Sequence, residues 1–311
     1  MGKSLVLGFF DGVHKAHRAV IESALKQSDD VTLITFKESP ALYFGGKAEY
    51  ILSRTNSINK IKKLGVKDVV ELDFSSIASM PANQYLEYLI DTYSPISIST
   101  GFNHTFGLNK QGTPEFLEQN QQKYNYKYIC VSPVIENNEI VSSTLIRDYL
   151  IKGNIEKANS LLESNFILEG TVIHGAKIGR TIGFPTANIS YPKEIVKIPF
   201  GVYSVNMEAG NNPSPLTPLP QGARGTVLGN FSQPSTLPQG AKKMNAIMNW
   251  GMKPTVHNTI EPVVEVHILD FDGDLYGADI KINVIKQIRG EKKFGSLDEL
   301  KTQIKEDIKN A

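Results

Sequence analysis

Hydrophobic and polar positions alternate along the first 150 residues in a way that predicts short strands separated by amphipathic helices. The expected strands are rich in Val, Ile, Phe and Tyr, and they occupy residues 3–10, 29–36, 66–74, 96–102 and 126–134. Apolar residues recur at helical spacing in the segments between them, which are 16–27, 54–65, 82–93 and 113–124. This alternation predicts an α/β domain in which helices cover a parallel sheet.

The pattern changes after about residue 165, where apolar runs are separated by Gly, Pro and Asn and helical periodicity nearly disappears. The stretch EPVVEVHILDF puts Val264, Val266 and Ile268 on one face of a strand and Glu265 and His267 on the other. Such strands predict a small antiparallel barrel or sandwich.

The chain ends in an amphipathic segment that predicts a helix packed on this barrel. Ser296 and Glu299 form a capping box at its start. The apolar residues that follow one stripe of the helix are Leu297, Leu300, Ile304 and Ile308. Two short helices broken at Gly153 form the joint between the halves, so we expect domains at 1–155 and 165–311.

One segment within the second domain differs from the rest in composition. Residues 211–243 are rich in Pro, Gly and Ser and contain two near-copies of a Leu-Pro-Gln-Gly-Ala pattern. Such a segment has too few apolar residues to offset the entropy of ordering. We expect an inserted mobile loop between two strands, with partner binding as the less favoured alternative.

Composition and charge exclude several classes of function. With 311 residues and 41% hydrophobic content, the chain can form two ordinary domains. A formal net charge of +1 gives no broad basic surface for nucleic acid or anionic membranes. Cys130 is the single cysteine, and neither a signal peptide nor a membrane-spanning run is recognised, so a cytoplasmic location is expected. Small molecules are the expected partners, and no obligate protein partner is evident.

The stretch GFFDGVHKAH places His14 and His17 three residues apart at the expected start of a helix. Three explanations compete: zinc ligands, solvated surface histidines, or donors at a helix N-terminus that face an anion. Zinc would need further ligands, and the chain has no HExxH or cysteine-rich partner motif. A strand, a Gly-containing turn and a helix start together deliver backbone N–H groups to one spot. Phosphate binding and the surface explanation both stay open.

A second stretch, VSSTLIRDYL, has hydroxyl groups at the start of an expected helix and Arg147 one turn later. Hydroxyls, backbone amides and a guanidinium can together bind phosphate. Taken alone, the stretch is better explained by an ordinary helix N-cap followed by a surface arginine.

The stretch GFPTANI carries two oxygen-bearing side chains, Thr186 and Asn188, two residues apart on an extended segment. Side chains at this spacing point the same way, and their oxygens suit a Mg²⁺ ion that bridges nucleotide phosphates. If the tetrapeptide PTAN at residues 185–188 is taken alone, a hydrogen-bonded turn is the alternative explanation.

Together, these motifs resemble those of the bacterial bifunctional riboflavin kinase/FMN adenylyltransferases. The resemblance rests on GFFDGVHKAH, TGFNHTFG and VSSTLIR in the first half. It implies a Rossmann-like nucleotidyltransferase domain in which His14, His17 and Arg147 stabilise the phosphates during adenylyl transfer. It also assigns ATP or phosphate binding to Gly8, Asp11, Asn103, Ser143 and Thr144.

The second half resembles the riboflavin kinase part of the same family through GAKIGRTIGFPTANI, NWGMKPT and VEVHILDFDGDLYG. The resemblance implies that Thr186 and Asn188 hold Mg-ATP and that Glu265 is the general base. From the residues alone, Glu265 could equally be a solvated residue on an edge strand. The resemblance also implies that Gly175, Gly179 and Arg180 shape the loop over the nucleotide. It implies that Arg289 lies near the flavin.

The resemblance therefore implies an enzyme that phosphorylates riboflavin to FMN and adenylylates FMN to FAD, with Mg²⁺ and ATP. Ala16 stands where the family motif has glycine, and His104 stands where phenylalanine is usual. A riboflavin kinase with an impaired adenylyltransferase domain is one alternative, and a non-catalytic flavin or nucleotide sensor is another. A protein that only binds its ligand needs no general base, so the presence of Glu265 argues against the sensor.

Overall fold

A computed structural model describes residues 2–173, 183–213, 243–254, 260–271 and 275–311. The chain divides into two compact units that exchange short segments. The first unit consists of Met1–Ile151, Lys157–Ser164 and Glu194–Lys197, and the second of Lys152–Glu156, Asn165–Lys193 and Ile198–Ala311. The predicted domain limits at 155 and 165 stay a prediction.

The first unit is built on a parallel sheet, as the sequence pattern predicts. Among the described residues its strand order is β3-β2-β1-β4-β5, and all neighbours run parallel. The strands are β1 (Ser4–Leu7), β2 (Val31–Phe36), β3 (Asp68–Leu72), β4 (Ser97–Gly101) and β5 (Lys127–Val131). The order reverses between β1 and β4, and ligands of open α/β sheets bind at the carboxyl ends of the strands at such a point.

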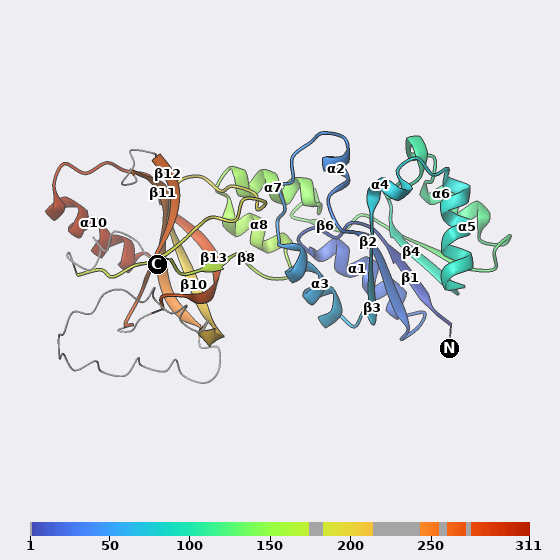
Figure 1. Ribbon diagram of the computed structural model, residues 1–311, viewed down its shortest axis with the longest axis horizontal. Helices are drawn as coiled ribbons and strands as arrows, with labels where there is room; N and C mark the ends of the chain where they lie inside the picture. Colours follow the sequence, from blue (N-terminus) through green and yellow to red (C-terminus); the bar gives the residue numbers. More distant parts are fainter. Residues whose placement is uncertain (1, 174–182, 214–242, 255–259, 272–274) are drawn as a thin grey trace, which may run out of the picture. The chain divides into compact units, whose positions relative to one another are not determined.

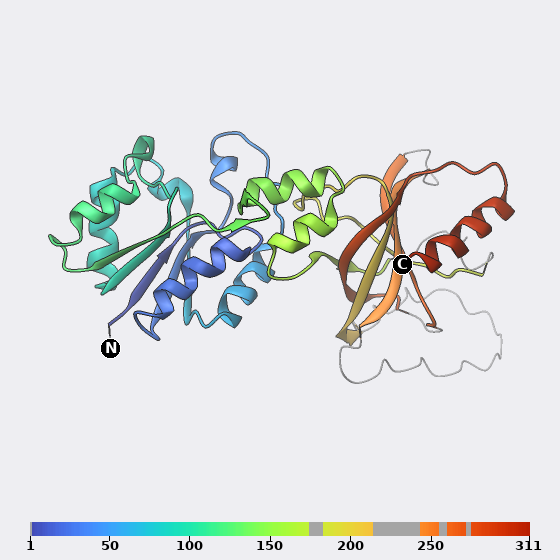
Figure 2. The ribbon, with the colours of Figure 1, turned by 180° about the vertical axis from the view of Figure 1, so that it is seen from behind.

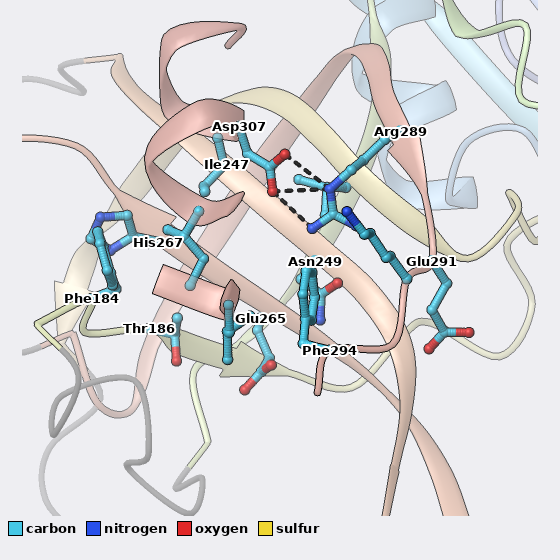
Figure 3. Close-up of a pocket in the computed structure, with 14 residues that line it drawn as sticks. Phe184, Thr186, Ile247, Asn249, Glu265, His267, Arg289, Glu291, Phe294 and Asp307 are labelled. Carbon is cyan, nitrogen blue, oxygen red and sulfur yellow. Dashed lines mark hydrogen bonds and ion pairs between the residues drawn. The ribbon is translucent and has the colours of Figure 1, made fainter. Parts of the chain in front are cut away.

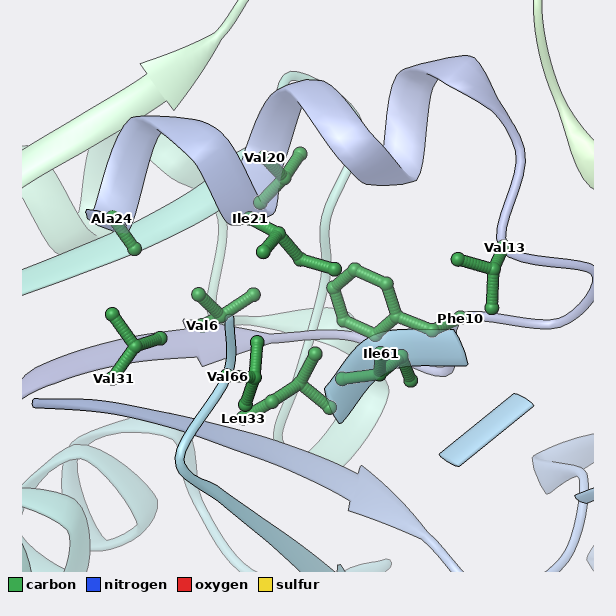
Figure 4. Close-up of a cluster of buried hydrophobic side chains, with 10 residues drawn as sticks. All are labelled: Val6, Phe10, Val13, Val20, Ile21, Ala24, Val31, Leu33, Ile61 and Val66. Carbon is green, nitrogen blue, oxygen red and sulfur yellow. The ribbon is translucent and has the colours of Figure 1, made fainter. Parts of the chain in front are cut away.

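Helices cover both faces of this sheet (Figures 1 and 2). The helices are α1 (Lys15–Leu25), α2 (Pro40–Tyr43), α3 (Arg54–Lys63), α4 (Phe74–Ile77), α5 (Ala82–Tyr93), α6 (Pro114–Asn120) and α7 (Ser143–Ile151). Ile21 of α1 and Ile61 of α3 pack with Val6 and Leu33 of the strands, and Figure 4 shows this cluster beneath α1. The opposite face packs against Leu86 of α5 and neighbouring apolar residues. A 3-10 turn, Leu108–Lys110, and a small hairpin of β6 (Ile135–Glu136) and β7 (Glu139–Ile140) complete the described elements up to α7.

The joint contains two short helices, α7 and α8 (Ile155–Leu161), as the sequence predicts. Gly153 lies between them with a φ of 78°, a left-handed conformation that glycine adopts without steric cost. The chain therefore turns sharply at this residue.

The second unit is a curled antiparallel sheet with the order β8-β13-β10-β11-β12-β9 in its described part. Its strands are β8 (Phe166–Thr171), β9 (Ala187–Ile189), β10 (Gly201–Pro213), β11 (Met244–Pro254), β12 (Ile260–Ile268) and β13 (Ala278–Gly290). The outermost strands meet where the N–H of Ile173 donates to the carbonyl of Asn188 at 2.8 Å. The predicted antiparallel barrel is confirmed as this curled sheet. Residues 214–242, most of the predicted insert, lie outside the described residues and connect β10 to β11.

Helix α10 (Leu297–Lys309) ends the chain. Half of the predicted capping box forms, because Ser296 Oγ accepts from the N–H of Glu299; the Glu299 carboxylate accepts from the N–H of Gly295, one residue before the N-cap, instead of from that of Ser296. The predicted apolar stripe is only half buried: Leu297 is 59% exposed, whereas Leu300 and Ile304 line a cavity. The helix faces that cavity rather than a tightly packed core.

Candidate active sites

A cavity of about 410 Å³ opens in the first unit at the point where the strand order reverses. Its walls include Leu7 at the end of β1, Gly101 at the end of β4 and Val131 at the end of β5. The start of α1 and the start of α7 supply further wall residues. The parallel topology therefore places two helix N-termini at one ligand-sized cavity, and such N-termini favour anions.

The loop from β1 to α1 is held in an unusual backbone conformation. Phe10, Gly12 and Val13 have φ values of 59°, 82° and 46°, in the left-handed region that β-branched residues such as valine rarely adopt. Phe10 and Val13 are buried in the core beneath α1 (Figure 4). At Gly8, a Cβ would lie 2.8 Å from the buried Phe10 ring. Core packing thus fixes the loop that presents the histidines.

His14 is the N-cap residue of α1, and its Nδ1 accepts a hydrogen bond from the backbone N–H of His17 at 3.3 Å. The two imidazole rings stack with centroids 3.5 Å apart and an interplanar angle of 16°. The Nδ1 atom of His17 is buried and, among the described residues, has no hydrogen-bond partner. Both histidines line the cavity.

Burial keeps these imidazoles neutral at neutral pH. It lowers the pKa of His14 from 6.5 to about 4, with a further contribution from the positive charge of Arg147. Burial and the neighbouring His14 likewise lower the pKa of His17. Because Nδ1 of His14 accepts a hydrogen bond, the neutral ring carries its proton on Nε2. His14 is therefore preset as a donor from Nε2.

Asp11 is buried, is not among the described residues that line the cavity, and joins three segments. Its carboxylate accepts from Arg147 of α7 at 2.9 Å and from the backbone N–H of Ile51 at 3.0 Å. The backbone carbonyl of Asp11 accepts from the Ser143 hydroxyl at 3.0 Å. Burial raises the pKa of the Asp11 carboxyl, while Arg147 and the amide of Ile51 oppose that rise. The pair connects the start of α7 to the loop that carries the histidines.

The second unit contains a cavity of about 270 Å³ between the curled sheet and α10. One row of directly paired residues crosses five strands beneath it. The row, from β13 through β10, β11 and β12 to β9, is Arg289, Val202, Asn249, Glu265 and Asn188. Paired residues share a face of the sheet, so the pleat points the row toward the cavity.

Glu265 lies at the centre of this oxygen-rich region. Strand β12 is flanked by β11 and β9, so Glu265 is not on an edge strand, which was the alternative left open by the sequence. Its carboxylate and the Thr186 hydroxyl both border the cavity and point to the same side in Figure 3. Asn188 lies directly opposite Glu265 in the register. Hydroxyl, amide and carboxylate oxygens form a donor set that fits Mg²⁺.

Two further contacts shape this cavity. His267 is hydrogen-bonded through Nδ1 to the carbonyl of Pro185 at 2.8 Å, and it therefore anchors the segment that carries Thr186. Because a carbonyl only accepts, Nδ1 of His267 carries the proton. Asp307 of α10 accepts from Arg289 at 2.8 and 2.9 Å (Figure 3). The second contact ties the terminal helix to the sheet.

Two family models together match nearly the whole chain. A riboflavin kinase family matches residues 162–311, and an FAD synthetase family matches residues 1–145. The bifunctional riboflavin kinase/FMN adenylyltransferase of Bacillus subtilis is 32% identical over 99% of this chain and 90% of its own length. The Escherichia coli protein of the same name is 32% identical over 98% of this chain and 90% of its own. The chain belongs to this bifunctional family.

A solved structure has the same fold. The crystal structure of a macrolide-efflux protein from Streptococcus pneumoniae superposes with a TM-score of 0.81 and 30% identity, over 99% of this chain and 93% of that one. That name belongs to the Streptococcus pneumoniae protein, and the likeness shows that this chain has the same fold. Within the described part of this chain, no helix has the length and apolar content needed to cross a membrane.

Most of the residues that the sequence predicts for adenylyl transfer lie at the first cavity. Those that line it are Gly8, His14, His17, Asn103, Ser143 and Thr144. Asp11 and Arg147 pair with each other and are not among the described residues that line it. No local pattern in the sequence indicates this pairing, since 136 positions separate the two residues.

The predicted kinase residues are placed less completely. Thr186, Glu265 and Arg289 line the second cavity, and Asn188 joins their row through the register. The predictions for Gly175, Gly179 and Arg180 fall outside the described residues. Asn249, His267 and Asp307 also line this cavity and were not predicted from the sequence. The available signals were the NWGMKPT stretch, which begins with Asn249, and the place of His267 two positions after Glu265 on the same strand face.

Proposed function

We propose that this chain catalyses two successive reactions at two separate sites. In the second unit, riboflavin and ATP give FMN and ADP; in the first unit, FMN and a second ATP give FAD and pyrophosphate. Family membership of both halves supports this proposal. The observation that carries it is that each unit has its own cavity, and that motif residues from distant parts of each half gather at it.

For the kinase reaction, Glu265 is proposed to take the proton from the ribityl 5′-hydroxyl. The hydroxyl oxygen then bonds to the γ-phosphorus of ATP, and the bond to the β,γ-bridging oxygen breaks with release of ADP. An internal strand with two asparagines beside it in the register holds the carboxylate in a defined position. A rigidly placed base within hydrogen-bond reach is what this proton transfer requires.

Mg²⁺ is proposed to bind with ATP at this site. Thr186 and Asn188 would hold it, and its charge would offset that of the phosphates. Their spacing places both oxygens on the Glu265 side of the sheet, which supports the assignment.

For the adenylyl transfer, a phosphate oxygen of FMN would bond to the α-phosphorus of ATP while pyrophosphate leaves. His14 and His17 are proposed to donate hydrogen bonds to the phosphate oxygens, and Asn103 to orient the FMN phosphate. Ser143 and Thr144 are proposed to hold the leaving pyrophosphate, and Arg147, which pairs with Asp11, is proposed to keep the start of α7 in place. Such transfer depends on positioning and charge stabilisation and needs no covalent nucleophile. Gly8 is proposed to let the nucleotide approach the backbone closely.

Separate chromatographic quantification of FMN and FAD tests the proposal. The purified chain is incubated with riboflavin, ATP and Mg²⁺, and in a second reaction with FMN in place of riboflavin. We expect FMN and then FAD in the first reaction, FAD in the second, and no product when EDTA removes the metal. FMN without FAD would support a kinase-only enzyme, and neither product from a folded chain would overturn the proposal in favour of a flavin or nucleotide sensor.

A further inference from the structure

A short segment from the kinase half of the sequence lies in the first unit. Glu194–Lys197 belongs to the first compact unit, although residues 162–311 match the riboflavin kinase family. Ile195 and Val196 are 3% and 0% exposed, so the segment is packed into that unit rather than lying loosely on its surface. We call Glu194–Lys197 the strap.

The strap pairs with the stretch at residues 49–52. The N–H of Tyr50 donates to the carbonyl of Glu194 at 2.8 Å, and the N–H of Val196 donates to the carbonyl of Tyr50 at 2.9 Å. The two hydrogen bonds make a parallel bridge between Tyr50 and Ile195. The strap thus acts as one more short strand against this stretch.

The opposite ends of the same two peptide groups, 49–50 and 50–51, bind the Asp11–Arg147 pair. The carbonyl of Glu49 accepts from Nε of Arg147 at 2.9 Å, and the N–H of Ile51 donates to the Asp11 carboxylate at 3.0 Å. The C=O and the N–H of one trans peptide group point in opposite directions. Residues 49–52 therefore lie between the strap on one side and the Asp11–Arg147 pair on the other.

The side chains of the stretch also reach the cavity wall. The Tyr50 hydroxyl accepts from the N–H of Ser39, the residue before the cavity residue Pro40. Ile51 lies against the loop that presents the histidines, because a Cβ at Gly12 would lie 3.0 Å from its Cγ2. A shift of this stretch would therefore move the loop, the Asp11–Arg147 pair and part of the wall together.

We propose that the strap is a positioning element for adenylyl transfer, acting through residues 49–52 and the Asp11–Arg147 pair. The inference rests on the proposed function of the first unit. It assigns to a segment within the kinase sequence a role in the other reaction. An adenylyltransferase site built only from the first 155 residues would lack this support.

The test uses the full-length chain with Val196→Pro, which removes the N–H that donates to Tyr50. Lys193→Pro is the matched control, because this exposed residue donates no backbone hydrogen bond within the described part of the chain. We expect kcat for FAD formation from FMN to fall roughly 10- to 100-fold in Val196→Pro, as for other small displacements of reacting groups. FMN formation from riboflavin should stay within twofold of the unchanged chain. Loss of FMN formation with FAD formation retained would overturn the proposal.

A double-mutant cycle separates positioning from a general loss of stability. In the Arg147→Ala background, Val196→Pro should reduce kcat for FAD formation by a smaller factor than it does in the unchanged chain, because the part of its route that runs through the Asp11–Arg147 pair is already removed. If the fold-reductions in kcat caused by Val196→Pro and by Arg147→Ala multiplied in full, the strap would act independently of Arg147, and the proposal would be overturned. If Val196→Pro unfolds the chain, shown by loss of cooperative melting, Ile195→Ala replaces it in the same cycle. An unchanged chain that makes FMN but no FAD would instead refute the proposed adenylyltransferase function on which the inference rests.

Discussion

A nearly buried aspartate paired with a partly exposed arginine occurs in both units, but the two pairs lie differently relative to their cavities. In the first unit, the side chain of Asp11 is 2% exposed and that of Arg147 is 30% exposed, and neither is among the described residues that line the cavity. In the second unit, Asp307 is 3% exposed and Arg289 is 21% exposed, and both residues line the cavity.

The surroundings of each aspartate explain the difference. Asp11 also accepts from two backbone amides, at Ile51 and Leu52, so it organises a loop and a stretch far apart in the sequence. Asp307 makes its contacts through the side chains of Arg289 and Gln303, so it joins one helix to one strand. The same ionic pair therefore serves as an internal tie in a parallel α/β unit and as a cavity wall in a curled sheet.

The largest expected effects test whether the two sites are separate. Glu265→Gln should lower FMN formation about 10²- to 10⁴-fold, because it removes the proposed general base, and should leave FAD formation from FMN unchanged. His17→Ala should lower FAD formation about 10²- to 10³-fold and leave FMN formation unchanged, because it removes a phosphate donor. Both products are measured by chromatography. Loss of both activities in either folded variant would contradict the separation of the sites.

Removal of each buried carboxylate compares the two pairs directly. Asp11→Ala should lower the free energy of unfolding by about 3–5 kcal/mol, since it leaves Arg147 and two buried amides without their acceptor. Asp307→Ala should cost less, about 1–3 kcal/mol, because Arg289 can turn toward water. Urea unfolding measures both values. Equal losses would show that the backbone amides bound by Asp11 contribute little.

Asp307→Asn tests whether the Asp307–Arg289 pair matters as part of the wall of the second cavity. The substitution removes the charge that orients Arg289 and weakens the contact of α10 with the sheet. We expect KM for riboflavin to rise about five- to tenfold while kcat changes less, which corresponds to roughly 1 kcal/mol or slightly more of lost binding. Steady-state kinetics with varied riboflavin measures this. The matching Asp11→Asn variant should leave KM for riboflavin unchanged, and a rise there would weaken the comparison.

The smallest expected effect concerns pH and the first unit alone. Burial lowers the pKa of His104 from 6.5 to about 4, and its Nε2 has no hydrogen-bond partner in the part of the chain that the structure describes. Between these two pH values the unfolded chain binds the proton more strongly, so the free energy of unfolding falls as pH drops from 6.5 toward 4.

His104→Phe should reduce that acid-induced loss by about 1–3 kcal/mol and raise stability at pH 7 by a smaller amount. Unfolding curves at pH 7, 5.5 and 4.5 give the comparison. A loss as steep in the variant as in the unchanged chain would show that the other buried imidazoles, at His14 and His17, account for it.

Local pattern predicted much of the fold and the identity of most cavity residues. Alternation at residues 264–268 correctly assigned the two faces of β12, and the capping box at Ser296 correctly marked the start of α10. It overestimated how deeply that helix is buried, since Leu297 is largely exposed. Periodicity reports which side of an element is apolar, but it does not report whether that side meets a core or a cavity.

The sequence by itself determined the order and type of the elements, since caps, turns and hydrophobic periods act over a few residues. It also located the motifs that lead to the family. Only the tertiary structure decided which distant groups meet: Asp11 with Arg147, Glu265 between two asparagines, and the strap against Tyr50. These pairings depend on strand register and on the packing of whole layers, and neither is encoded in any short stretch of residues.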